Sequence, residues 1–187
     1  VVGDGLILLG GGPWGTCAPG PVLPTLDAEI RLARACLMLG KPVIGIGLGS
    51  QILALAADGG VEAAPLTLSV GEARRGADDA LGGLLPEHSP SVVYMRARPV
   101  PPSYATTLAV DERGYSALFQ VAPNAFGFTA HPGVRDAMIE DRVREFEEAP
   151  RDTAEGLAKI ATLGAAIDDA LVPIMAGLIA ATGWMSV

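Results

Sequence analysis

Three glycines at alternate positions, Gly45, Gly47 and Gly49, constrain the fold of this chain more than any other feature. They lie where an apolar segment, residues 43 to 46, passes into a helix-forming segment that reaches residue 58. Glycines at a strand-to-helix turn permit a sharp elbow whose middle residue projects over the sheet. Such an elbow presents a nucleophile at a helix N-terminus, where the helix dipole lowers the pKa of a thiol. In this chain the middle residue is Gly47, which has no side chain.

The elbow belongs to a regular alternation of strands and helices. Residues 5 to 9 are an apolar run that ends in a glycine-rich loop, which predicts a buried strand. Apolar residues of the segment from 26 to 37 recur at helical spacing, and Gly40 ends that helix. Strand, helix, strand and helix within about 55 residues are typical of a doubly wound α/β sheet.

The remainder of the chain predicts three further regions. Residues 61 to 125 hold short strand-like pieces separated by glycine, proline and charge, which favours an antiparallel section. These pieces cover residues 66 to 70, 92 to 95, 107 to 110 and 117 to 121, and residues 126 to 130 predict another core strand. Residues 136 to 148 form a charged segment that we expect to face solvent. A long apolar stripe from residue 157 to residue 178 predicts a C-terminal helix. We therefore predict an α/β fold with a doubly wound, mostly parallel sheet and helices on both faces.

Length and composition limit the organisation and the partners. A chain of 187 residues fits a single domain, residues 1 to 187. The net charge of −8 argues against nucleic acid as a partner, because phosphate binding needs a basic surface. Two cysteines provide no disulfide framework and predict a cytoplasmic location. Two histidines leave little material for a metal site, and we expect no metal and no cofactor.

The C-terminal segment raises the question of a membrane. Residues 170 to 187 carry no charge, and their number is the lower limit for a membrane span. Proline, two glycines and many alanines in this segment favour a helix packed against protein instead. We expect a helical extension over residues 152 to 187, with a possible interface to another chain, and no membrane anchor.

The residues around the elbow resemble a known family. The segment from Lys41 to Gln51 is similar to the signature of class I glutamine amidotransferase domains, in which the position of Gly47 holds the catalytic cysteine. The Gly11-Gly12-Pro13 loop resembles the family's glycine loop, and His131-Pro132 resembles its late His-Pro-Glu motif. The resemblance covers residues 5 to 135 and implies a flavodoxin-like fold of the amidotransferase kind.

The resemblance also implies roles for individual residues. The backbone N–H of Leu48 and the loop at Gly11 and Gly12 would form an oxyanion hole. Gln51 would contact a bound amino acid, and His131 would be the general base.

Two departures decide the functional prediction. Gly47 replaces the nucleophile, and Gly133 stands where the family has the glutamate that orients the base. Loss of the nucleophile alone removes several orders of magnitude of rate. We therefore expect a non-catalytic subunit of a larger enzyme complex, with a structural role or a small amino-acid-like ligand.

Two enzymatic alternatives remain open. The chain could be a working glutaminase whose cysteine has been replaced, or a hydrolase that uses Cys17 or a bound water. Trp14 follows the glycine loop, and we expect it to plug the pocket. The family also has a strand and a helix before the block that opens this chain, so we expect preceding residues or another chain to fill that place.

Overall fold

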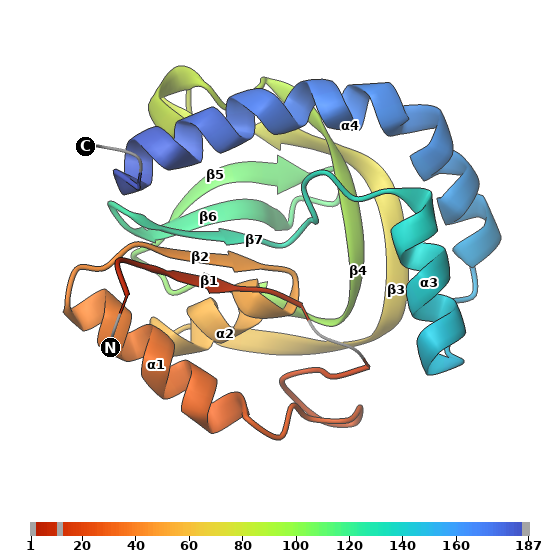
Figure 1. The fold of residues 1–187 in the computed structure, drawn as a ribbon, viewed down its shortest axis with the longest axis horizontal. Coiled ribbons are helices and arrows are strands. Elements are labelled where there is room, and N and C mark those ends of the chain that lie inside the picture. Colours follow the sequence, from red (N-terminus) through yellow and green to blue (C-terminus); the bar gives the residue numbers. More distant parts are fainter. Residues whose placement is uncertain (1–2, 11–12, 185–187) are drawn as a thin grey trace.

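The computed structural model describes residues 3–10 and 13–184, which form one mixed sheet flanked by helices (Figure 1). The strands are β1 (Leu6–Leu8), β2 (Val43–Ile46), β3 (Gly60–Arg75), β4 (His88–Val100), β5 (Thr106–Asp111), β6 (Ser116–Ala122) and β7 (Ala125–Phe128). The helices are α1 (Leu26–Met38), α2 (Leu48–Ala56), α3 (Asp136–Phe146) and α4 (Thr153–Thr182), with a short 3₁₀ helix at Ala80–Gly83. The strand order is β1-β2-β7-β6-β5-β3-β4.

The sheet has the predicted α/β architecture, but it is mixed and not mostly parallel. Strands β1, β2 and β7 pair in parallel, whereas β3 with β4, β3 with β5, β5 with β6, and β6 with β7 pair antiparallel. A parallel pair needs a long crossover, usually a helix, and residues 61 to 125 contain no α-helix that could supply one. Short connections therefore make these strands antiparallel, as the strand-like pieces of that region predicted.

Strands β3 and β4 are much longer than their sequence indicated. We expected strands over residues 66 to 70 and 92 to 95, and the structure extends them to Gly60–Arg75 and His88–Val100. Charged side chains of both strands lie on the exposed face, as the ion pair between Glu62 and Arg98 shows. Buried residues alternate with more exposed ones in the second half of β4, and β3 pairs with β4 along its length, so charge did not mark the end of either strand.

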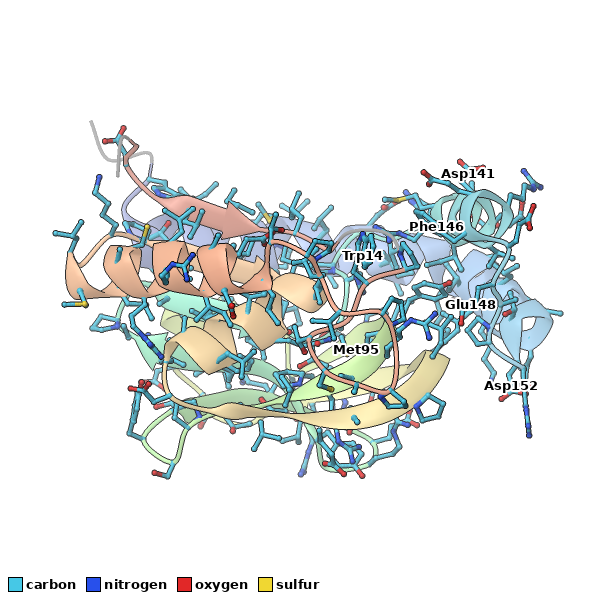
Figure 2. The ribbon with its side chains drawn as sticks, turned by 90° about the horizontal axis from the view of Figure 1, so that it is seen from below. Trp14, Met95, Asp141, Phe146, Glu148 and Asp152 are labelled. Carbon is cyan, nitrogen blue, oxygen red and sulfur yellow. The ribbon has the colours of Figure 1, made fainter. Side chains whose placement is uncertain are left out.

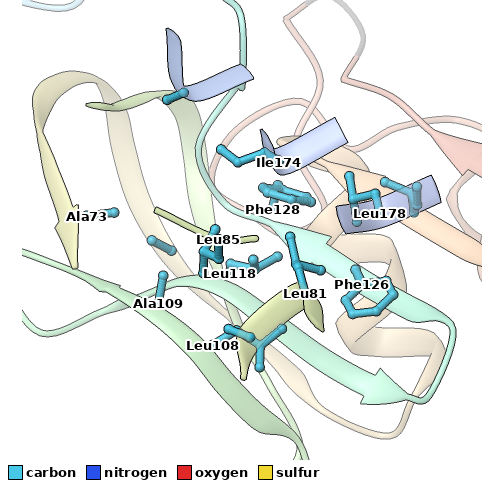
Figure 3. Packing of buried hydrophobic residues seen from close by; sticks show 14 residues of the cluster. Ala73, Leu81, Leu85, Leu108, Ala109, Leu118, Phe126, Phe128, Ile174 and Leu178 are labelled. Atoms are coloured by element: carbon cyan, nitrogen blue, oxygen red, sulfur yellow. The ribbon is translucent and has the colours of Figure 1, made fainter. Parts of the chain in front are cut away.

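Helices cover both faces of the sheet (Figure 1). Helices α1 and α2 pack on one face around Ile52, Leu53 and Phe119. Helix α4 packs on the other face, where Ile174 and Leu178 contact the phenylalanines of β7 (Figure 3). The C-terminal helix is thus part of the domain core. The end of the predicted extension, residues 185–187, lies outside the described residues.

Helix α4 is also the one helix of the described chain that is long and apolar enough to cross a membrane. Its 30 residues contain a window of mean hydropathy 1.7, of which 28% is buried in the protein. The core helix of a globular protein meets the same criterion, and the contacts of Ile174 and Leu178 with the sheet are of that kind.

Candidate functional site

The three parallel strands end at one edge of the sheet, and their ends define the site. Gly10 follows β1, Gly47 follows β2 directly, and His131 comes three residues after the end of β7. The backbone N–H of Gly47 donates to the carbonyl of Phe128 (2.9 Å), and that of His131 donates to the carbonyl of Val92 (2.8 Å). Open α/β sheets bind their ligands at such strand ends.

Gly47 has the backbone of a nucleophile elbow without a nucleophile. Its φ of 59° and ψ of −117° are accessible to glycine and strained for other residues. The imidazole of His131 stands where a side chain would be, because a methyl group at position 47 would lie 2.4 Å from His131 Nε2. The ring of His131, which the resemblance implies as the base, therefore occupies the space that a side chain at position 47 would need.

Gly133, where the resemblance implies a carboxylate, is crowded as well. Gly133 has a φ of 73°, and a methyl group there would lie 3.0 Å from a δ-carbon of Leu171. Leu171 belongs to α4, which packs over this turn. A carboxylate at position 133 would have to displace the end of Leu171 and adopt a strained backbone before it could approach His131.

His131 is a buried, neutral histidine. Burial lowers its pKa from 6.5 to about 4, the carbonyl of Val92 offsets part of that effect, and the positive charge of Arg142 lowers the pKa further. Its Nδ1 atom is inaccessible to solvent and has no hydrogen-bond partner among the described residues. A base held by an orienting carboxylate would have its pKa raised, which is the opposite effect.

Gln51 is fully buried and uses both ends of its amide inside the protein. Its Oε1 accepts a hydrogen bond from Thr16 Oγ1 (2.6 Å), and its Nε2 donates to the carbonyl of Ala97 (2.9 Å). These bonds tie the loop after β1 and strand β4 to α2. The geometry assigns Gln51 a positioning role, and its predicted contact with a ligand stays a prediction.

A narrow pocket opens in front of these residues: its atom-free space is about 490 Å³ with open solvent included, and a cavity of about 30 Å³ within it admits a water-sized molecule. Its lining comes from four separate parts of the chain. The loop after β1 contributes Gly10, Pro13 and Trp14; α2 contributes Leu48 and Gln51; β3 and β4 contribute Leu66, Tyr94, Met95 and Arg96; and the C-terminal half contributes His131, Arg142, Phe146 and Glu148. Trp14 stands in this wall, and Figure 2 shows it on the same side of the molecule as Phe146 and Glu148. Our expectation that Trp14 plugs the pocket stays a prediction.

Our expectation that residues 136 to 148 face solvent is wrong for part of this segment, because Ile139 is buried in the core and Glu148 lines the pocket. Arg142 and Phe146 are half-buried and line the pocket. Phe146 is the only aromatic residue of α3, and Arg142 precedes it by one helical turn, which places both side chains on one face. This spacing is the signal that could have identified them.

The remaining predicted residues are distributed as follows. Leu48 is the first residue of α2 and lines the pocket. Its backbone nitrogen lies 3.8 Å from where a methyl group on Gly10 would be. Cys17 lines a different hollow, together with Arg96 and with residues 18 to 20, which follow Cys17 in the chain. His131 is not among the residues of that hollow. Gly11 and Gly12 lie outside the described residues, so their predicted role stays untested.

Comparisons with known proteins agree on the fold. No protein-family model and no curated protein sequence matches the chain. Among solved structures, the protein SMU.1228c shares 15% identity, with 94% of this chain and 80% of that chain covered and a TM-score of 0.72. Glutamine amidotransferases from Thermotoga maritima and Methylobacillus flagellatus share 20% and 21% identity, each with 94% of this chain and 77% of that chain covered and a TM-score of 0.70. The chain therefore has the fold of a class I glutamine amidotransferase domain.

Proposed function

We propose that this protein is a non-catalytic, amidotransferase-like subunit that binds a small ligand in the former glutamine pocket. The observation that carries the proposal is the occupation of the nucleophile position by the His131 ring. Nucleophilic catalysis needs an attacking group, a base within hydrogen-bonding reach and a group that orients the base. In this chain the first is absent at Gly47, and the third is absent at Gly133.

Membership of a larger complex is the second part of the proposal. A structural neighbour from Thermoplasma acidophilum is described as one subunit of a GMP synthase, at 17% identity with 89% of this chain and 75% of that chain covered and a TM-score of 0.54. Apolar side chains at the free edge of the sheet support a similar arrangement here, since Ile7 is 53% and Leu9 63% exposed. Val172, 72% exposed on the outer face of α4, offers a second apolar contact. The two cysteines are free thiols, in keeping with a cytoplasmic protein.

Measurement of ammonia release from glutamine tests the proposal directly. We expect the wild-type protein and Gly47→Cys to show no turnover, because the new side chain would meet His131 and no carboxylate would orient the base. A Cys17→Ser background leaves Cys36, which is completely buried, as the other cysteine. Labelling with a thiol reagent in that background then shows whether the introduced thiol is accessible. A working glutamine amidotransferase serves as the positive control.

The same experiment separates the enzymatic alternatives. Restored turnover in Gly47→Cys would favour a glutaminase whose cysteine has been replaced. Turnover in the wild type at enzymatic speed would overturn the proposal, and its loss in Cys17→Ser would identify the other hydrolase. The position of Cys17 outside the pocket speaks against that last outcome.

A further inference from the structure

The charges of the pocket wall leave one guanidinium without a counterion. Arg96 pairs with Glu148 and also donates from Nε to the carbonyl of Pro13 (2.9 Å). Arg142 forms no ion pair within the described part of the chain. Its closest charged neighbours in sequence, Glu140 and Asp141, both pair with Arg144.

The missing counterion of Arg142 points to a ligand because Arg142 is half-buried. Arg31, Arg74 and Arg151 also lack ion pairs within the described residues, but they are exposed and solvated by water. Arg142 is half-buried and stands in a wall with Trp14, Tyr94 and Phe146. A partly desolvated guanidinium beside aromatic rings is costly without a counterion, and a planar carboxylate is the group that it binds best.

The net charge of the lining specifies the ligand further. Arg96 and Glu148 neutralise each other, His131 is neutral at pH 7, and Arg142 leaves one positive charge. Because Arg96 already engages Glu148, a ligand ammonium would have to compete for that carboxylate. The start of α2 at Leu48, also in the wall, adds the positive end of a helix dipole.

We propose that this pocket binds a small monocarboxylate with an apolar or aromatic body, whose carboxylate pairs with Arg142 while its body lies against Trp14 and Phe146. The inference rests on the proposed function, because a working glutaminase would need the same space for zwitterionic glutamine. It differs from that function in the class of ligand, which carries a carboxylate and no ammonium group. Aromatic walls with a single charged anchor are the usual composition of such small-molecule sites.

Titration calorimetry with three matched probes tests the ligand class. The probes are 3-phenylpropanoate, phenylalanine and phenethylamine, which share a phenyl body and carry a negative, a zwitterionic and a positive head group. We expect 3-phenylpropanoate to bind at least tenfold more tightly than either of the others. Tighter binding of the zwitterion or of the amine, or no binding of any probe, would overturn the inference.

Two arginines of the same helix supply the matched variants. We expect Arg142→Gln to weaken 3-phenylpropanoate binding at least tenfold and Arg142→Lys to restore part of it, since lysine keeps the charge and loses the bidentate geometry. Arg144→Gln removes an exposed arginine of α3 and should leave the affinity within twofold of the wild type. Equal effects of Arg142→Gln and Arg144→Gln would contradict the assignment.

Tryptophan fluorescence locates the bound probe. The chain has two tryptophans, and Trp184 follows the end of α4, packs against the core and is not among the residues that line the pocket. In a Trp184→Phe background, 3-phenylpropanoate should change the emission of Trp14 with the same affinity as in calorimetry. Binding that leaves Trp14 unchanged would place the ligand elsewhere and overturn the inference. Ammonia release from glutamine would instead overturn the proposed function, so the two failures are distinguishable.

Discussion

Substitution of Gly49 by alanine should abolish folding or lower the free energy of unfolding by at least about 3 kcal/mol. At Gly49, helix α2 approaches strand β1 so closely that a methyl group at this position would lie 2.0 Å from the carbonyl oxygen of Leu8. The two atoms that the methyl group would meet first, the carbonyl oxygen and carbonyl carbon of Leu8, belong to the backbone. Leu8 is held by its pairing with Gly45, so β1 cannot retreat without losing its place in the sheet.

Urea unfolding monitored by circular dichroism checks this expectation, and a second helical glycine is the matched control. Gly164 lies within α4, where the nearest atom to a new methyl group is the flexible end of Arg135 at 3.3 Å. Gly164→Ala should stabilise the protein by about 0.5–1 kcal/mol, because alanine favours a helix interior. If Gly49→Ala unfolds within 1 kcal/mol of the wild type, the packing of α2 on β1 described above is wrong.

The second large effect is a loss of stability in acid that depends on His131. Burial lowers the pKa of His131 in the folded protein to about 4, whereas the unfolded chain has the ordinary value of 6.5. As the pH falls through 6.5, the unfolded state therefore takes up a proton that the folded state does not. The free energy of unfolding should decrease by up to about 3 kcal/mol between pH 7 and pH 4, with no contribution from this group above pH 7.

Comparison of pH profiles isolates this contribution from those of the carboxylates. His131→Gln removes the titrating ring, so its free energy of unfolding should decrease less with falling pH than that of the wild type. The difference between the two free energies should therefore narrow as the pH falls. His88→Gln is the control, because His88 lies on the surface against Glu72 (2.7 Å) and its loss should leave the acid-dependent decrease in place. Parallel profiles of wild type and His131→Gln would show that the ring is not buried as the structure has it.

The two departures from the amidotransferase motif reinforce each other in three dimensions. Loss of the side chain at position 47 creates room into which the His131 ring fits, and Leu171 of α4 occupies the side of Gly133. In the non-catalytic pocket that we propose, Arg142 keeps a positive charge that has no counterion in the described chain. The proposed monocarboxylate ligand follows from this charge and from the aromatic walls, independently of glutamine chemistry.

Local sequence patterns predicted the parts of the fold that depend on neighbouring residues. The alternate glycines indicated the elbow, and the structure gives Gly47 a positive φ at that turn. Apolar spacing predicted α1 and α4, since helical periodicity follows from the residues of one segment alone. The same reasoning underestimated β3 and β4, because their length follows from the pairing of one with the other, and charged residues continue a strand within such a pair.

Sequence alone determined that no nucleophile stands at the elbow and that a strand–helix alternation precedes the antiparallel section, because both are properties of adjacent residues. Only the tertiary structure decided what fills the vacant space and what lines the pocket. His131 reaches Gly47, Leu171 reaches Gly133, and Arg142 and Phe146 face Trp14 across more than a hundred residues of sequence. Such contacts depend on how the sheet and helices pack, and side-chain packing between distant segments leaves no periodic trace in the chain.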